Sequence, residues 1–80
     1  MRYTIAMKSS ANPKSQQKFG DNLRKIRTSK QLSQEEAAKA IGISVTYYAG
    51  IERGEENPTF AVIENICKAL KVKSSQILPF

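Results

Sequence analysis

The feature that most constrains the fold is a pair of short predicted helices separated by a tight turn. Ser33 and Glu36 have the spacing of a capping box, in which each side chain accepts a hydrogen bond from the other residue's amide. Gly42 ends the first helix, because glycine adopts the left-handed conformation there without steric cost. Ser44 then caps the second helix. The two helices are predicted over about 34–41 and 45–53.

Helices joined by so short a turn cross at a steep angle and touch closely near the turn. That geometry requires a small residue midway along the first helix, where Ala38 stands. It also requires apolar residues on the inner face of the second helix, where Tyr48 and Ile51 stand. We expect Tyr48 in the core with its hydroxyl reaching the edge, and Glu52 in a structural ion pair or cap. The pattern predicts a helix-turn-helix, although a helical hairpin without a binding role also fits it.

Three further helices are indicated by apolar residues at helical spacing. The first runs over about 16–30, and Thr59 and Ser74 are expected to cap the last two. Their inward residues are predicted to be Phe19, Leu23 and Ile26, then Phe60, Ile63, Ile66, Cys67 and Leu70, then Ile77 and Leu78. We therefore predict an all-α fold, a compact five-helix bundle over residues 16–80, preceded by a flexible basic arm over residues 1–15.

The charge balance favours a polyanionic partner. Thirteen Lys and Arg against seven Asp and Glu give a net charge of +6 on 80 residues, and such a field attracts nucleic acid or an acidic membrane surface. A basic surface that only aids solubility is the alternative at this point. For the cluster of Lys25, Arg27 and Lys30, a solvated face and DNA contact are equally consistent with the pattern.

Several function classes are disfavoured by what the chain lacks. With no histidine and the single Cys67, the sequence assembles neither a zinc cluster nor a Cys/His catalytic pair. We therefore expect no enzyme activity and no cofactor. No apolar run approaches the ~20 residues that cross a bilayer, and the N-terminal residues lack a secretory core. We predict a cytoplasmic protein with no membrane association.

Four segments in order carry a family resemblance: LSQEEAAKAIGIS, YAGIERGEENPT, ICKAL and KVKSSQIL. The chain resembles the Cro/cI-type (XRE) helix-turn-helix regulators of bacteria and phages. Through TYYAGIERG it is similar to the controller proteins of restriction-modification systems, although Tyr48 stands where a smaller aliphatic residue is usual. The resemblance implies a lambda-repressor-like DNA-binding domain, a symmetric homodimer and a palindromic double-stranded DNA operator.

The resemblance leaves the biological setting open. A restriction-modification controller, a phage-type repressor and an antitoxin all fit, as do blocking and recruitment of RNA polymerase. A helical protein-interaction module without DNA binding is the alternative from another class.

The resemblance also implies roles for individual residues. Gln34 and Arg53 match phosphate contacts, and Gly50 stands where many relatives carry a long polar base reader. The residues expected at the DNA-facing start of the second helix are Ser44, Val45, Thr46 and Tyr47. Thr46 is able to hydrogen-bond a base edge or touch a thymine methyl, whereas Val45 is limited to the methyl contact. Because none of these residues is a bidentate reader, we expect part of the sequence preference to come from DNA shape.

The C-terminal residues Ile77, Leu78 and Phe80 are more apolar than a small monomer exposes. We predict that they form the dimer contact with part of the preceding helix, and closure of the core is the alternative for Ile77. A two-fold dimer places its two recognition helices about 34 Å apart, one turn of DNA.

Overall fold

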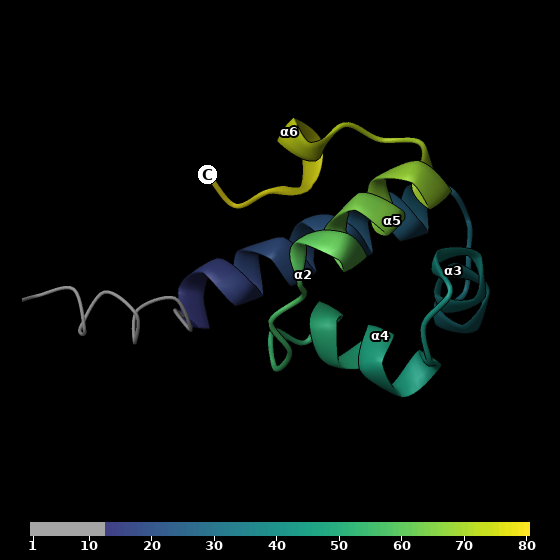
Figure 1. The fold of residues 1–80 in the computed structure, drawn as a ribbon, viewed down its shortest axis with the longest axis horizontal. Helices are drawn as coiled ribbons and strands as arrows, with labels where there is room; N and C mark the ends of the chain where they lie inside the picture. Colours follow the sequence, from purple (N-terminus) through teal and green to yellow (C-terminus); the bar gives the residue numbers. More distant parts are fainter. Residues whose placement is uncertain (1–12) are drawn as a thin grey trace, which may run out of the picture.

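The computed structural model describes residues 13–80, in which it places five helices (Figure 1). Residues 1–12, most of the expected N-terminal arm, lie outside the described residues. The helices are α2 (Pro13–Ser29), α3 (Gln34–Ile41), α4 (Val45–Glu52), α5 (Phe60–Leu70) and α6 (Ser74–Ile77). The described residues contain no strand. The predicted all-α, five-helix fold is confirmed.

Helix α2 begins earlier than the sequence indicated. It starts at Pro13, so that residues 13–15, expected in the arm, form its first turn. Proline suits this position because its fixed φ is helical and the amide it lacks would have no partner in the helix. Residues 13–15 therefore belong to the helical domain, whereas the expectation for residues 1–12 stays a prediction.

The capping residues of the helix pair behave as predicted. The Ser33 hydroxyl accepts from the Glu36 amide at 3.0 Å, and the Glu36 carboxylate accepts from the Ser33 amide at 2.8 Å. Gly42 has φ +92° and donates to the Ala38 carbonyl at 2.8 Å. The Ser44 hydroxyl accepts from the Tyr47 amide at 3.1 Å. The turn between α3 and α4 is therefore fixed by local hydrogen bonds on both sides.

Two expectations at the C-terminal helices are wrong. Phe60 is not an inward residue, because it is the first residue of α5 and is 88% exposed. Ser74 lies inside α6 instead of capping it, because Lys73 is the N-cap and its amide donates to the Gln76 side chain at 2.8 Å. The predicted cap at Thr59 is confirmed by the hydrogen bond from the Val62 amide at 3.2 Å.

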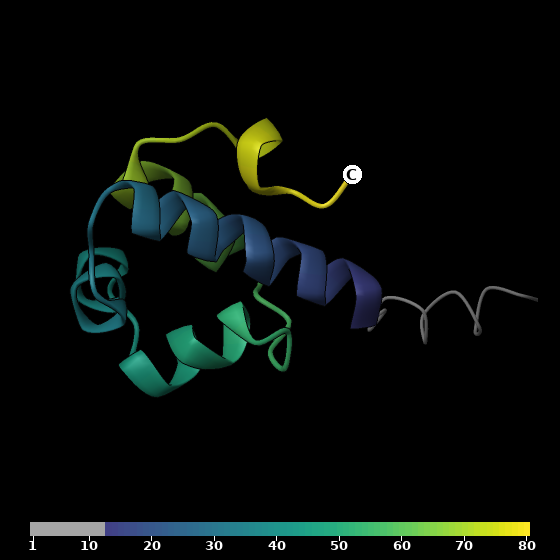
Figure 2. The ribbon, with the colours of Figure 1, turned by 180° about the vertical axis from the view of Figure 1, so that it is seen from behind.

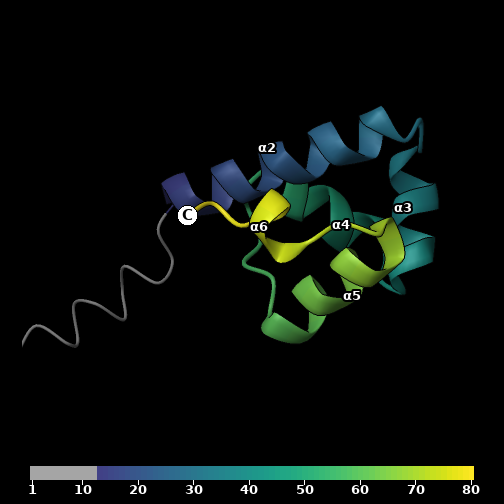
Figure 3. The same cartoon turned by 90° about the horizontal axis from the view of Figure 1, so that it is seen from above.

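Every helix contributes to one core. Figure 2 shows α2 running across the bundle, with α4 on one side of it and α6 on the other. Seen from above, in Figure 3, α6 lies alongside α2, near the C-terminus of the chain. The buried apolar residues are Phe19, Leu23, Ala37, Ala38, Ile41, Tyr48, Ile51, Ile66, Leu70 and Ile77.

The burial of Ile77 corrects its predicted place in a dimer contact. Its side chain is 0% exposed within the single chain, so it closes the core and presents nothing to a partner. The Asn22 side chain holds this segment on α2 by donating to the Ile77 carbonyl at 3.0 Å. Leu78 is half-buried and Phe80 is 94% exposed, so these two remain available for contact.

Candidate nucleic-acid interface

The first turn of α4 presents a short exposed surface. Ser44 and Thr46 are exposed and Val45 is 38% exposed, while Tyr47 is half-buried against the core. At the other end of α4, Tyr48 and Ile51 are 0% exposed. The helix thus buries its second half and offers its N-terminal turn, which is the arrangement expected of a helix that enters the major groove with its first residues.

The C-terminal end of α4 packs directly on the backbone of α2. A Cβ added at Gly20 would lie 2.5 Å from the Ile51 carbonyl oxygen and closer still to that of Glu52. Only glycine allows this approach, because both contacts are to backbone atoms that no side-chain rotation can remove. Gly20 was not assigned a role from the sequence, although a glycine inside a predicted helix signals a close packing contact.

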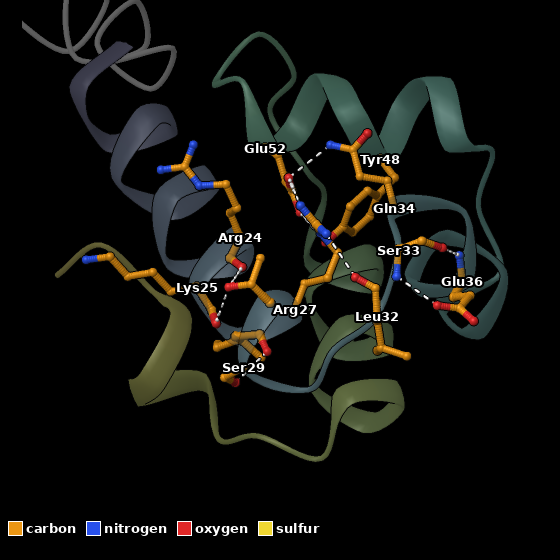
Figure 4. Close-up of polar contacts among 12 residues, drawn as sticks. Arg24, Lys25, Arg27, Ser29, Leu32, Ser33, Gln34, Glu36, Tyr48 and Glu52 are labelled. Atoms are coloured by element: carbon orange, nitrogen blue, oxygen red, sulfur yellow. Dashed lines mark hydrogen bonds and ion pairs between the residues drawn. The ribbon is translucent and has the colours of Figure 1, made fainter.

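A buried carboxylate joins three helices at the same place. Figure 4 shows Arg27 of α2, Gln34 of α3 and Tyr48 of α4 converging on Glu52. Arg27 donates through Nε to Oε2 at 2.6 Å and through Nη2 to Oε1 at 3.1 Å. Tyr48 donates to Oε2 at 2.6 Å and Gln34 to Oε1 at 3.0 Å. The predicted structural ion pair of Glu52 and the core position of Tyr48 are confirmed.

These contacts shift the protonation equilibria of the three ionisable groups. Burial by itself would raise the pKa of Glu52, but the hydrogen bonds from Arg27, Tyr48 and Gln34 outweigh it and leave that pKa lowered. The hydrogen bond to Glu52 raises the pKa of Arg27. Burial, followed by the bond to Glu52, raises the pKa of Tyr48. Glu52 and Arg27 are therefore both charged at neutral pH, and Tyr48 keeps its proton.

The two predicted phosphate contacts lie at the ends of the helix pair. Gln34 is the first residue of α3 and is half-buried, with its amide bonded to Glu52. Arg53 follows α4 and is exposed, where it pairs with Glu55 at 3.0 Å. The hydrogen bond between the two groups raises the pKa of Arg53 and lowers that of Glu55.

The structure separates Arg27 from the two lysines with which it was grouped. Arg27 is no part of a solvated or DNA-facing cluster, because its guanidinium is buried against Glu52, whereas Lys25 and Lys30 are exposed. Gly50, which stands where many relatives carry a long polar base reader, is buried, and a Cβ there would lie 2.7 Å from the Glu56 side chain. The sequence pattern of this helix did not distinguish Arg27 from its basic neighbours.

Within residues 13–80, no helix combines the length and apolar character that crossing a bilayer requires. The same residues hold no group of three His, Cys, Asp or Glu side chains that could ligate a metal ion.

Comparisons with known proteins agree with this geometry. The Helix-turn-helix (HTH_3) family model matches residues 23–77. The control protein C.MunI of Mycoplasma sp is 38% identical over 61 residues, which cover 75% of this chain and 82% of that protein. An uncharacterized HTH-type transcriptional regulator, YazB of Bacillus subtilis (strain 168), is 36% identical over 61 residues, covering 76% of this chain and 88% of YazB.

The solved structures give the same result. The restriction-modification controller protein C.AhdI from Aeromonas hydrophila superposes with a TM-score of 0.76 at 36% identity, covering 79% of this chain and 96% of that chain. The matched family is one of transcription regulators and not of enzymes. The chain therefore belongs to the helix-turn-helix family HTH_3 of DNA-binding transcription regulators.

Proposed function

We propose that this protein binds a palindromic operator as a homodimer and regulates transcription from it in a sequence-specific manner. The observation that carries the proposal is the exposed first turn of α4, whose other half is buried in the core and clamped by α2. A helix held in this way enters the major groove at a fixed angle, because its position does not depend on its own weak stability as an isolated helix.

Each residue of that turn contacts a different group of the DNA in this proposal. The Val45 methyl groups suit a thymine methyl, and the Thr46 hydroxyl suits a base edge. The Tyr47 ring is half-buried, which leaves its hydroxyl to reach a phosphate or a base acceptor. Gln34 and Arg53 contact backbone phosphates. With no bidentate reader in the turn, DNA shape supplies the remainder of the preference.

The dimer contact that we propose lies between the C-terminal residues and the start of α5, away from the first turn of α4. Leu78, Phe80, Phe60 and Ile63 border an open, mainly apolar groove of about 630 Å³. In Figures 1 and 2, α6 and α4 lie on opposite sides of the bundle. A partner subunit bound at this groove therefore leaves the first turn of α4 accessible to DNA.

The setting that we propose is control of a restriction-modification operon in the cytoplasm, where the operator-bound dimer blocks or recruits RNA polymerase. Its support is the similarity to C.MunI and C.AhdI over most of the chain. Neighbouring genes for an endonuclease and its methyltransferase would support this setting, and a neighbouring toxin gene would favour the antitoxin alternative.

Selection of binding sites from random duplexes tests the DNA-binding proposal. The purified protein should enrich a palindrome, and its association constant for that duplex should fall with salt with a log–log slope near −6, if each subunit neutralises about three to four phosphates. The Thr46→Ala/Tyr47→Ala double variant should lose the preference for the selected site. The exposed Asn65→Ala on α5 should keep it.

The double variant is compared with the parent only after circular dichroism shows that it is folded, because Tyr47 also packs on the core. A folded double variant that binds the selected duplex as tightly as the parent contradicts the proposed role of α4. For the dimer, Phe60→Ser/Phe80→Ser should sediment as a monomer, since both rings are exposed in the single chain. A dimer unchanged in this variant places the subunit contact elsewhere.

A further inference from the structure

The carboxylate of Glu52 has no acceptor position left for solvent. A carboxylate accepts about four hydrogen bonds, and four donors reach this one: Arg27 Nε and Nη2, the Tyr48 hydroxyl and Gln34 Nε2. Glu52 itself is 7% exposed. The four donors therefore fill the acceptor positions of this carboxylate.

The two Arg27 nitrogens and the Tyr48 hydroxyl are explained by folding alone, whereas the Gln34 amide does not need this partner in order to fold. Tyr48 is fully buried and the Arg27 side chain is only 13% exposed, so both need partners within the fold. Gln34 is half-exposed at the start of α3, where its amide would be satisfied by water. Its bond to Glu52 instead fixes the plane of the amide and leaves the second Nε2 hydrogen for another acceptor.

We propose that Glu52 is a positioning residue for DNA binding, which holds the Gln34 side chain in the conformer that donates to a backbone phosphate. The inference rests on the proposed function and adds a residue that does not itself touch DNA. Ordering a free glutamine side chain at the moment of binding costs about tenfold in affinity, and Glu52 removes that cost by ordering it in the free protein.

Arg27 makes this arrangement compatible with an anionic ligand. A lone carboxylate beside Gln34 would repel the phosphate, but the two-pronged bond from Arg27 balances its charge. Arg27 also donates through Nη1 to the Leu32 carbonyl at 2.9 Å, which holds the segment that leads into α3. The same ion pair thus fixes both the backbone before Gln34 and the side-chain partner of Gln34.

A purely structural role for Glu52 makes a different prediction, and Tyr48 separates the two. The Tyr48 hydroxyl bonds Oε2, whereas Gln34 bonds Oε1. Tyr48→Phe therefore removes one donor from the same carboxylate and leaves the bond to Gln34. If Glu52 only stabilises the fold, loss of either contact should affect DNA binding in proportion to the loss of stability.

The test is a double-mutant cycle in binding to the selected duplex. Gln34→Met keeps the length of the side chain and removes the amide, and Glu52→Asp keeps the charge but withdraws the carboxylate from Gln34. Each single variant should weaken binding about tenfold, and the double variant should be no weaker than Gln34→Met alone. Tyr48→Phe should change the Kd less than twofold while lowering the urea midpoint.

Losses that multiply in the double variant overturn the proposal, as does a Tyr48→Phe variant that binds as weakly as Glu52→Asp. A second measurement needs neither DNA nor an Asp variant that folds. In NMR spectra of the free parent protein, the Gln34 side-chain amide should be more ordered than that of the exposed Gln31. Equal mobility of the two amides also overturns the inference. A parent that binds no duplex instead refutes the proposed function and leaves the NMR result to stand separately.

Discussion

Replacement of Gly20 by alanine tests how α4 is held. The added Cβ would lie 2.5 Å from the Ile51 carbonyl oxygen and closer still to that of Glu52, so the two backbones must separate by at least about 0.9 Å to reach an ordinary contact of 3.4 Å. Overpacking of this kind costs about 1–3 kcal/mol. Alanine in place of glycine inside a helix stabilises the fold by about 1 kcal/mol through its higher helix propensity. Because the obstructing atoms belong to the backbone, we expect the overpacking cost at the upper end of that range, about 3 kcal/mol, and hence a net loss of about 2 kcal/mol.

The effect on DNA binding follows from where the displacement falls. The eight residues of α4 span about 12 Å, so a shift of about 0.9 Å at the Ile51 end tilts the helix by about 4° around the turn at Gly42. Arg53 moves most and Thr46 least. Gly20→Ala should therefore weaken operator binding about fivefold through the phosphate contact, the equivalent of one hydrogen bond, and keep the order of preferred bases.

Urea unfolding followed by circular dichroism measures the first effect, and fluorescence anisotropy with the selected duplex and its single-base variants measures the second. Ala40→Gly is the matched control, because Ala40 is exposed on α3 and should lose about 1 kcal/mol by helix propensity alone. A Gly20→Ala variant as stable as the parent, or more stable, refutes the packing argument. A changed base preference would contradict the argument that α4 tilts around the turn at Gly42.

The remaining predictions concern the turn and the charged pairs. Gly42→Ala should cost about 1–2 kcal/mol through its φ of +92° alone, since no atom lies within 4 Å of the added Cβ; an unchanged urea midpoint contradicts this. Because the pKa of Glu52 is lowered on folding, its stabilisation is complete above the ordinary carboxyl pKa and is lost as the pH falls below about 4.3. Arg27→Met should therefore lower the free energy of unfolding by about 3–5 kcal/mol at pH 7, and by less in acid, where Glu52 takes up a proton. Urea titrations at pH 7 and below the ordinary carboxyl pKa measure whether the loss becomes smaller in acid. Glu55→Gln should tighten operator binding severalfold by releasing Arg53 from its exposed partner, with the urea midpoint nearly unchanged as the control; equal affinity would mean that Arg53 does not contact DNA.

The sequence predicted the parts of this fold that depend on neighbours in the chain. The caps at Ser33, Ser44 and Thr59 and the left-handed Gly42 follow from local hydrogen bonding and backbone sterics, and all four are confirmed. Phe60 was assigned inward because it continues the apolar period of α5, yet a residue in the first turn lacks the packing that the period assumes.

The parts that were missed depend on contacts between residues far apart in the chain. Arg27 and Glu52 are separated by 25 positions, and the basic face of α2 gives no sign that one of its charges is interior. Gly20 meets α4 through backbone oxygens, which no side-chain pattern reports. The roles of Gln34 and Arg53 came from family resemblance, and their phosphate contacts stay predictions.

The two ends of α4 are fixed by different means, and this separation has a consequence for recognition. Its N-terminal turn is set by the Ser44 cap and the Gly42 turn, whereas its C-terminal end is set by Gly20 and the Glu52 carboxylate. Val45 and Thr46, which we propose face the bases, take part in neither set of contacts. Substitutions at these two positions are therefore free to change which operator is preferred at little cost in folding, whereas substitutions at the clamp change affinity for all operators together. We therefore expect a chain built this way to acquire a new operator through substitutions in its exposed turn.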